Sequence, residues 1–234
     1  MFRTLLCWVV FIITTVILAT AAVSLSLFDS SGNIPHCVAR LWGRIQLRTT
    51  GTRIRVQGLE NIDPHKSYIL VSNHQSSFDI FCLLGYLPLQ FRWTAKAELF
   101  RIPFMGWAMT RTGYIPIERD SPKKAYRSML RAAEVVRQGT SVIIFPEGTR
   151  SPDGRLQPFK KGVFLIALKS RAPILPITIQ GASRIMRKGD WRMHPGEVRI
   201  QIDPAVDSAA IPGDTEAELS RRVRDTMLKN LANT

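Results

Sequence analysis

His74 and Asp79 belong to a short polar segment, NHQSSFD (73–79), that directly follows the apolar run YILVS. A histidine at the exit of a buried strand, followed closely by a carboxylate, is a pattern that can serve proton transfer. If Ser76 or Ser77 caps the next helix, Asp79 lies in the early turns and accepts a hydrogen bond from one imidazole nitrogen. That bond fixes the tautomer and leaves the other nitrogen as a general base. The alternative for this motif alone is a helix-capping segment with an inert, hydrogen-bonded histidine.

A second polar segment, PEGTRS (146–151), follows the apolar run SVIIF in the same way. Gly148 allows backbone N–H groups to approach a ligand, because glycine adopts conformations closed to other residues. Arg150 offers a planar fork of donors that suits phosphate. Taken alone this segment could be a plain turn. Two such motifs at the ends of buried strands are a much more specific sign of a functional site.

Strands and helices alternate along the part of the chain that carries these motifs. We expect strands at 53–56, 68–72, 91–95, 114–116, 141–145, 174–180 and 198–202. Helices are expected at 77–85, 103–112, 121–138, 162–169 and 214–231, with Ser121 capping the third and Pro122 in its first turn. This alternation predicts an α/β layered domain around a mostly parallel central sheet.

The N-terminal segment differs from the rest of the chain, because residues 5–27 contain no charged side chain. As a helix they would extend roughly 35 Å at about 1.5 Å per residue, close to a bilayer core of about 30 Å. We expect a membrane-embedded helix here. A cleaved signal peptide, with Arg3 as its basic region, and a buried core helix are the alternatives.

A basic amphipathic helix is expected next, from about residue 34 to 51, with Trp42 as an interfacial anchor. The chain would then divide into membrane-anchoring helices, 1–50, and an α/β domain, 51–234. The turn at 29–33 is compatible with a helical hairpin in one leaflet, which we favour, and equally with a spanning helix followed by an interfacial one. Arginines are more frequent after the apolar segment than before it, which favours a cytoplasmic location for the main domain.

The composition is globular but strongly basic, with 32 Lys and Arg against 18 Asp and Glu, a net charge of +14. This balance favours anionic partners such as lipid, phosphorylated small molecules or nucleic acid. Neither a helix-turn-helix nor an aromatic RNA-binding sheet motif is present, which argues against nucleic acid. The three cysteines, Cys7, Cys37 and Cys82, are far apart, so we expect neither disulfides nor a metal site.

Together these motifs resemble the glycerolipid acyltransferase family. NHQSSFD is similar to its NHxxxxD box and FPEGTRS to its FPEGTRS box. More narrowly, the chain resembles the 1-acyl-sn-glycerol-3-phosphate (lysophosphatidic acid) acyltransferases of bacterial type. Support comes from GYIPIER (113–119), PILPI (173–177), and KAEL (96–99) followed by Pro103 and Gly106. The resemblance covers roughly residues 50–205. Its one mild departure is Glu118, where the family commonly has Asp.

The resemblance implies that His74 deprotonates the acceptor hydroxyl, which attacks the thioester carbonyl directly while Asp79 orients the imidazole. No GxSxG nucleophile motif is needed or found. Phosphate binding is implied for Arg119, Arg150 and Lys96, and Lys160 and Lys161 are expected to extend the basic rim. The loop Glu147, Gly148 and Thr149 is expected to supply backbone N–H groups to the oxyanion. Glu147 would either bind glycerol hydroxyls or hold the loop.

The predicted function is therefore transfer of a fatty acyl group to the sn-2 hydroxyl of lysophosphatidic acid at the inner face of the cell membrane. Acyl-CoA or acyl carrier protein would be the co-substrate, with no cofactor and no metal. The sequence does not decide between these donors, nor the acyl length or the oligomeric state. Alternatives are another lysolipid or glycerol 3-phosphate as acceptor, and a non-catalytic lipid-binding membrane protein.

Overall fold

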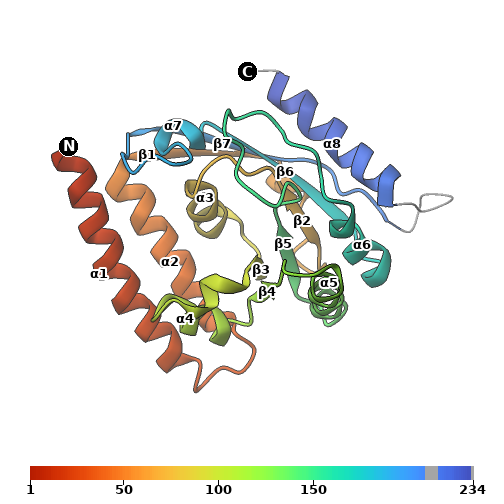
Figure 1. Cartoon of the computed structure of the whole chain (residues 1–234), viewed down its shortest axis with the longest axis horizontal. Helices are drawn as coiled ribbons and strands as arrows, with labels where there is room; N and C mark the ends of the chain where they lie inside the picture. The colour runs from red at the N-terminus through yellow and green to blue at the C-terminus, as the bar shows by residue number, and fades with distance from the viewer. Residues whose placement is uncertain (209–215, 233–234) are drawn as a thin grey trace.

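A computed structural model describes residues 1–208 and 216–232, apart from the side chain of Lys161. Within these residues, seven strands form one sheet in the order β1-β7-β6-β2-β5-β3-β4 (Figure 1). The strands are β1 Thr52–Gln57, β2 Ile69–Ser72, β3 Phe91–Lys96, β4 Ile115–Ile117, β5 Ser141–Ile144, β6 Ile174–Gln180 and β7 Gly196–Ile202.

Neighbouring strands are parallel except for β6 and β7, which pair antiparallel. The parallel pairs require crossover connections, and helices supply them. The prediction of an α/β domain with a mostly parallel sheet is confirmed.

Successive side chains of the central strands enter different cores, because side chains alternate across a sheet. Leu70 of β2 packs in one cluster with Phe78, while its neighbours Ile69 and Val71 pack in a second cluster with Ala132. The first face is covered by α3 (Phe78–Tyr86). The second is covered by α5 (Pro122–Arg137), α6 (Leu165–Ser170) and α8 (Glu216–Ala232) (Figure 1). Strands β2 and β5 are therefore buried at every position, and β6 at all but its last residue.

Several helix boundaries follow local signals in the sequence. Ser121 caps α5, its hydroxyl accepting from the Lys124 amide at 3.3 Å, and Pro122 occupies the first turn, as expected. The expected helix 103–112 is shorter, α4 Met105–Arg111, and the segment predicted as helix 162–169 is split into η3 (Lys161–Val163) and α6. The start of the expected helix 214–231 lies outside the described residues. The short elements η1 (Leu59–Asn61), η2 (Ala97–Arg101) and α7 (Ala182–Ile185) were not expected.

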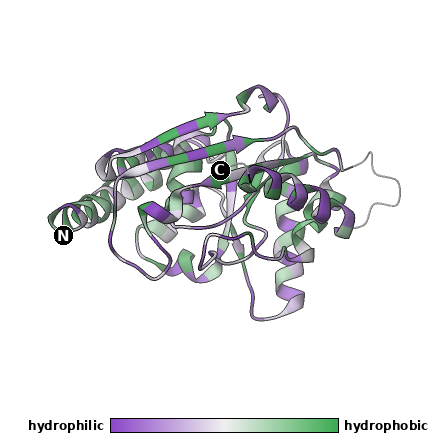
Figure 2. Cartoon of the chain, turned by 90° about the horizontal axis from the view of Figure 1, so that it is seen from above, coloured by the Kyte–Doolittle hydropathy of each residue, from purple (hydrophilic) through white to green (hydrophobic). Residues whose placement is uncertain are grey.

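The N-terminal helices α1 (Phe2–Leu25) and α2 (Asn33–Thr50) form a hairpin that lies side by side with the domain (Figure 1). α1 is long and apolar enough to cross a membrane, and only 17% of its most apolar window is buried. Figure 2 colours most of this helix as hydrophobic. β1 starts at Thr52, one residue after the expected division at residue 51, and Cys7 and Leu47 share a core cluster with Phe78.

Polar contacts fix the hairpin internally and at its turn. Gln46 donates to Thr14 at 2.8 Å, and the Trp42 indole N–H donates to Thr15 at 3.0 Å. Trp42, expected as an interfacial anchor, is half-buried, and its ring packs edge-on against Phe81, with ring centroids 5.0 Å apart. The inward position is favourable because the indole finds both an apolar contact and an acceptor there.

The cysteines are all free thiols. Cys7 and Cys82 are buried, whereas Cys37 is exposed on α2.

Candidate active site

The polar motifs meet at one edge of the sheet. His74 follows the carboxyl end of β2, and the loop from Glu147 to Arg150 follows β5, the strand beside it. Lys96 ends β3, and Arg119 follows β4. Parallel neighbours place their carboxyl ends on the same side, which is where open α/β sheets commonly bind ligands. The topology therefore gathers residues from four separate sequence segments.

Asp79 accepts three hydrogen bonds on one carboxylate oxygen. Its Oδ2 lies 2.8 Å from His74 Nδ1, 2.6 Å from the Gln75 amide and 2.8 Å from the Ser76 amide. The side chain of Asp79 is fully buried, while that of His74 is 14% exposed. With the proton on Nδ1 donated to Asp79, the lone pair of Nε2 remains available as a base.

Two serines lie at the N-terminus of α3, and they make different contacts. Ser77 is the N-cap by position but makes no capping hydrogen bond, and its hydroxyl accepts from Arg150 at 2.9 Å. Ser76 accepts from the Phe78 amide at 3.2 Å and donates to the Met186 carbonyl. The helix start is thus tied both to the Arg150 loop and to the segment after α7.

Phe145 stacks on the ring of His74. The two ring centroids are 3.8 Å apart and the planes differ by 6°. Trp93 supports Phe145 from 5.5 Å. The imidazole is therefore held by a flat apolar surface as well as by Asp79, which fixes both its position and its rotation.

Glu147 links the two polar motifs through its carboxylate. Oε1 accepts from the His74 amide at 2.6 Å and Oε2 from the Gln157 amide at 2.9 Å. The His74 carbonyl in turn accepts from the Ser151 amide at 2.7 Å. Burial raises the pKa of Glu147 to about 7, although both amide donors oppose that rise. Of the two roles expected for Glu147, these contacts favour holding the loop.

The loop after Glu147 approaches the basic side chains closely. Gly148 has φ +70, a backbone conformation that favours glycine. A Cβ placed there would lie 2.7 Å from Lys160 Cε, so there is also no space for a side chain. Its N–H donates to the Phe145 carbonyl at 3.1 Å, which leaves that amide occupied within the loop. Its carbonyl accepts from Arg119 at 2.6 Å.

Five cationic side chains line the cavity beside His74, and the described lining residues include no carboxylate. They are Lys96, Arg119, Arg150, Lys160 and Lys188. Glu118 instead pairs with Lys124 at 3.1 Å. Such a concentration of uncompensated positive charge favours a phosphorylated ligand.

Lys188 and Phe145 are site residues that sequence analysis missed. Lys188 donates to the Arg150 carbonyl at 2.7 Å from the segment after α7. No motif marks that segment. Phe145 could have been found, because it is the last residue of the apolar run before PEGTRS.

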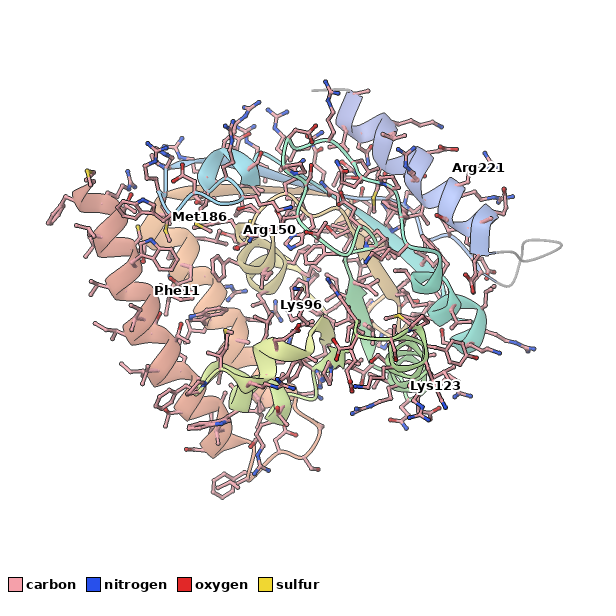
Figure 3. All side chains as sticks on the ribbon, viewed as in Figure 1. Phe11, Lys96, Lys123, Arg150, Met186 and Arg221 are labelled. Atoms are coloured by element: carbon pink, nitrogen blue, oxygen red, sulfur yellow. The ribbon has the colours of Figure 1, made fainter. Side chains whose placement is uncertain are left out.

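The cavity is about 1020 Å³ in volume and mostly apolar away from the cations. It extends from His74 to α1, α2 and α4, where Phe11, Trp42 and Met109 are among its walls. Figure 3 labels lining residues from different elements: Phe11, Lys96, Arg150 and Met186. A cavity with a cationic end and an apolar chamber is complementary to an amphiphile with an anionic headgroup. Among the described residues, no group of three or more His, Cys, Asp or Glu side chains could hold a metal ion.

The sequence profile of the acyltransferase family matches residues 53–180. The chain is 34% identical over 201 residues to a 1-acyl-sn-glycerol-3-phosphate acyltransferase from Pseudomonas aeruginosa, covering 83% of this chain and 77% of that protein. It is 40% identical over 194 residues to the chloroplastic 1-acyl-sn-glycerol-3-phosphate acyltransferase BAT2 of Brassica napus, covering 82% of this chain. The match spans only 56% of that plant protein.

The fold is also similar to a solved structure. The crystal structure of the 1-acyl-sn-glycerophosphate acyltransferase PlsC from Thermotoga maritima superposes with a TM-score of 0.86 at 28% identity. The superposition covers 99% of this chain and 94% of that one, so the likeness includes the N-terminal helices.

Proposed function

The chain belongs to the acyltransferase family, and we propose that it transfers a fatty acyl group from a thioester to the sn-2 hydroxyl of lysophosphatidic acid. The product is phosphatidic acid. The observation that carries this proposal is the His74–Asp79 pair, which lies at the cationic end of a cavity whose other end is apolar. Lysophosphatidic acid has matching parts, a phosphate, a hydroxyl and one chain.

In this reaction Nε2 of His74 removes the proton of the acceptor hydroxyl as its oxygen attacks the thioester carbonyl. Asp79 stabilises the imidazolium that forms, because its carboxylate already accepts from Nδ1 at 2.8 Å. The tetrahedral intermediate collapses with loss of the thiolate, which takes the proton from His74. The acyl group passes directly to the acceptor, so the enzyme needs no serine or cysteine nucleophile.

The phosphate of the acceptor is held by Arg119, Arg150 and Lys96. Arg150 donates a hydrogen bond to the Ser77 hydroxyl, and Arg119 donates one to the Gly148 carbonyl. These two bonds hold both guanidinium groups beside the same loop. Lys160 and Lys188 add charge at the same end of the cavity. The oxyanion is stabilised by backbone N–H groups of the 147–149 loop. Because the Gly148 amide is bonded within the loop, those of Glu147 and Thr149 are the better candidates.

The apolar chamber accommodates acyl chains, and the donor is acyl-CoA or acyl carrier protein. Membrane association places the chamber near its lipid substrate. We propose that the hairpin enters only one leaflet, since α1 contacts the domain near both ends. Trp8 donates to the Trp191 carbonyl at 3.0 Å, and Ala22 lines the cavity at the other end. A spanning helix would carry one end about 30 Å away to the opposite surface. A cytoplasmic catalytic domain at the inner membrane remains a prediction from the arginine distribution.

The test is the lipid product formed by purified protein from a panel of acceptors: lysophosphatidic acid, uncharged and zwitterionic lysolipids, and glycerol 3-phosphate. Each acceptor is combined with acyl-CoA and with acyl carrier protein thioester. The proposal predicts phosphatidic acid as the main product. A faster reaction with another acceptor would reassign the substrate. Binding without any thiol release would indicate a non-catalytic lipid-binding protein.

A further inference from the structure

A cluster of large apolar side chains is exposed in the segment from the end of η2 into the first turn of α4. Ile102 is 43% exposed, Phe104 37% and Trp107 55%, and the rings of Phe104 and Trp107 lie 5.2 Å apart. We call residues 102–107 the aromatic turn. The exposed residues Arg101 and Arg111 flank it on either side.

The backbone holds this cluster outward. Phe104 has φ +61, a conformation that bulky residues rarely adopt. The turn is closed by the Gly106 amide, which donates to the Ile102 carbonyl at 2.8 Å. A Cβ at Gly106 would lie 2.2 Å from the Phe100 carbonyl oxygen, so the turn is also packed tightly against η2. The exposed rings therefore sit on a constrained support.

The opposite side of the same segment forms a wall of the cavity. Leu99, Met105 and Met109 line it from this segment, and Leu18 and Ala22 of α1 line it from the hairpin. α1 and α4 are packed against each other. Beyond them, α1 exposes a stripe at helical spacing, formed by Leu5, Val9, Ile12, Ile13, Val16 and Ile17. The aromatic turn thus leads into α4, which packs against the same long apolar helix that exposes this stripe.

We propose that the aromatic turn is a further membrane-contacting element, which inserts Ile102, Phe104 and Trp107 into the leaflet that receives α1. The flanking arginines suit anionic headgroups, and tryptophan favours the depth where headgroup and hydrocarbon meet. Continuity with α1 favours a bilayer over a protein partner. If the proposed function also holds, the acceptor lipid reaches the cavity between α1 and α4 directly from the leaflet.

The depth of the turn can be measured in the full-length protein with a fluorescent label. In a Cys37→Ser background, Trp107→Cys is labelled with NBD and the protein is reconstituted into phosphatidylcholine–phosphatidylglycerol vesicles. Matched labelling of Leu228→Cys, on α8, is the control, since Leu228 is 37% exposed and α8 lies on the opposite side of the molecule from α1 and α4 (Figure 1). We expect nitroxide-bearing lipids to quench the label at 107 at least several-fold more than at 228. Equal lipid quenching at both positions, with strong quenching by aqueous iodide at 107, would overturn the proposal.

A kinetic arm tests lipid entry separately. Trp107→Glu should lower turnover of vesicle-embedded lysophosphatidic acid about tenfold or more, and leave turnover of a short-chain, water-soluble analogue unchanged. Leu228→Glu should change neither rate. An equal loss on both substrates, with the melting temperature unchanged, would contradict the entry route; Ile102→Gln repeats the test if Trp107→Glu fails to fold. Absence of acyl transfer by the unmodified protein on both substrates would instead refute the proposed function, and the label at 107 would still report membrane contact.

Discussion

His74 is held by contacts of three kinds, and each constrains a different degree of freedom. Asp79 fixes the tautomer, the stacked ring of Phe145 fixes the imidazole plane, and Glu147 and Ser151 fix the backbone on both sides. A base held in this way loses little free energy to reorganisation during proton transfer.

Asp79→Asn should reduce kcat by about 10²–10⁴-fold, because the neutral amide neither stabilises the imidazolium nor enforces the tautomer. The helix start should survive, since an amide oxygen can still accept from the Gln75 and Ser76 amides. The measurement is kcat alongside a thermal melt in detergent. A fall of less than tenfold with an unchanged melt would contradict the role of Asp79.

Arg150→Ala should raise KM for lysophosphatidic acid far more than KM for the acyl donor. A charge-assisted hydrogen bond is worth roughly 1.5–3 kcal/mol, about tenfold to a hundredfold in affinity. Arg150→Lys should recover only part of the lost affinity, because the lysine ammonium is a point charge and lacks the planar set of donors of the guanidinium. Arg119→Ala should behave like Arg150→Ala.

A matched control for these variants is Arg187→Ala, because Arg187 is exposed and is not among the cavity-lining residues. Steady-state kinetics with each substrate varied in turn provides the comparison. A selective loss of donor affinity in the Arg150 variant would show that the phosphate assignment is misplaced.

At this scale the sequence predicts residues that lie in a motif and misses those that reach the site through tertiary structure. The spacing of His74 and Asp79 already indicates their hydrogen bond, because both flank one helix start. Lys188 reaches the Arg150 carbonyl from a segment 38 residues away, a closeness that depends on the packing of α7. Glu147 could be placed in the loop, but only the structure gives both of its acceptor contacts.

Among the elements, α2 is docked through a buried histidine. His36 is fully buried, with Nδ1 3.1 Å from the Tyr114 hydroxyl and its ring edge-on to Phe91. Burial, together with the nearby charges of Arg92 and Arg40, lowers the pKa of His36 to about 3. The neutral imidazole is therefore the form that fits between the hairpin and the sheet.

This burial predicts loss of stability in acid. The folded-state pKa lies below the unfolded value of about 6.5, so the stabilisation is complete above that pH. As pH falls from about 6.5 toward 3, the unfolded state binds a proton that the folded state does not bind. The free energy of unfolding therefore falls by up to about 1.4 kcal/mol per pH unit. Melting temperatures between pH 7.5 and 4.5 should fall more steeply for the native protein than for His36→Gln. Parallel curves for the two proteins would rule out this contribution.

Periodicity predicts the elements well where they are long or continuously apolar. The run SVIIF and the capped segment after Ser121 are close to β5 and α5 as observed. Short elements such as η2 and α7 carry too few residues for a periodic signal. β7 pairs antiparallel with the preceding strand β6 and parallel with β1, which is distant in the sequence. The sequence does not indicate which strands become neighbours.

For the whole molecule, the apolar face of α1 predicts tight membrane attachment. Detergent should be needed for extraction, because burial of its exposed side chains stabilises the bound state by about 25 cal/mol per Å² of apolar surface. The check is fractionation of membranes after high salt and after alkaline carbonate. Release of the full-length protein by either treatment would contradict the membrane placement.

The one-leaflet arrangement has its own test. A cysteine substituted for Phe2, which is 83% exposed, should react only with reagent added on the side of the catalytic domain. Labelling from the opposite side would refute this arrangement while leaving membrane attachment intact.

The whole account depends on direct acyl transfer with His74 as the base. The most direct measurement follows thiol release and phosphatidic acid together, using purified native protein and His74→Ala at equal amounts and equal melting temperatures. We expect the native protein to release thiol only when lysophosphatidic acid is present, with one thiol released for each phosphatidic acid formed. The rate of His74→Ala should be lower by about 10²–10⁴-fold. Substantial turnover by His74→Ala, or a burst of thiol release without acceptor, would contradict the mechanism.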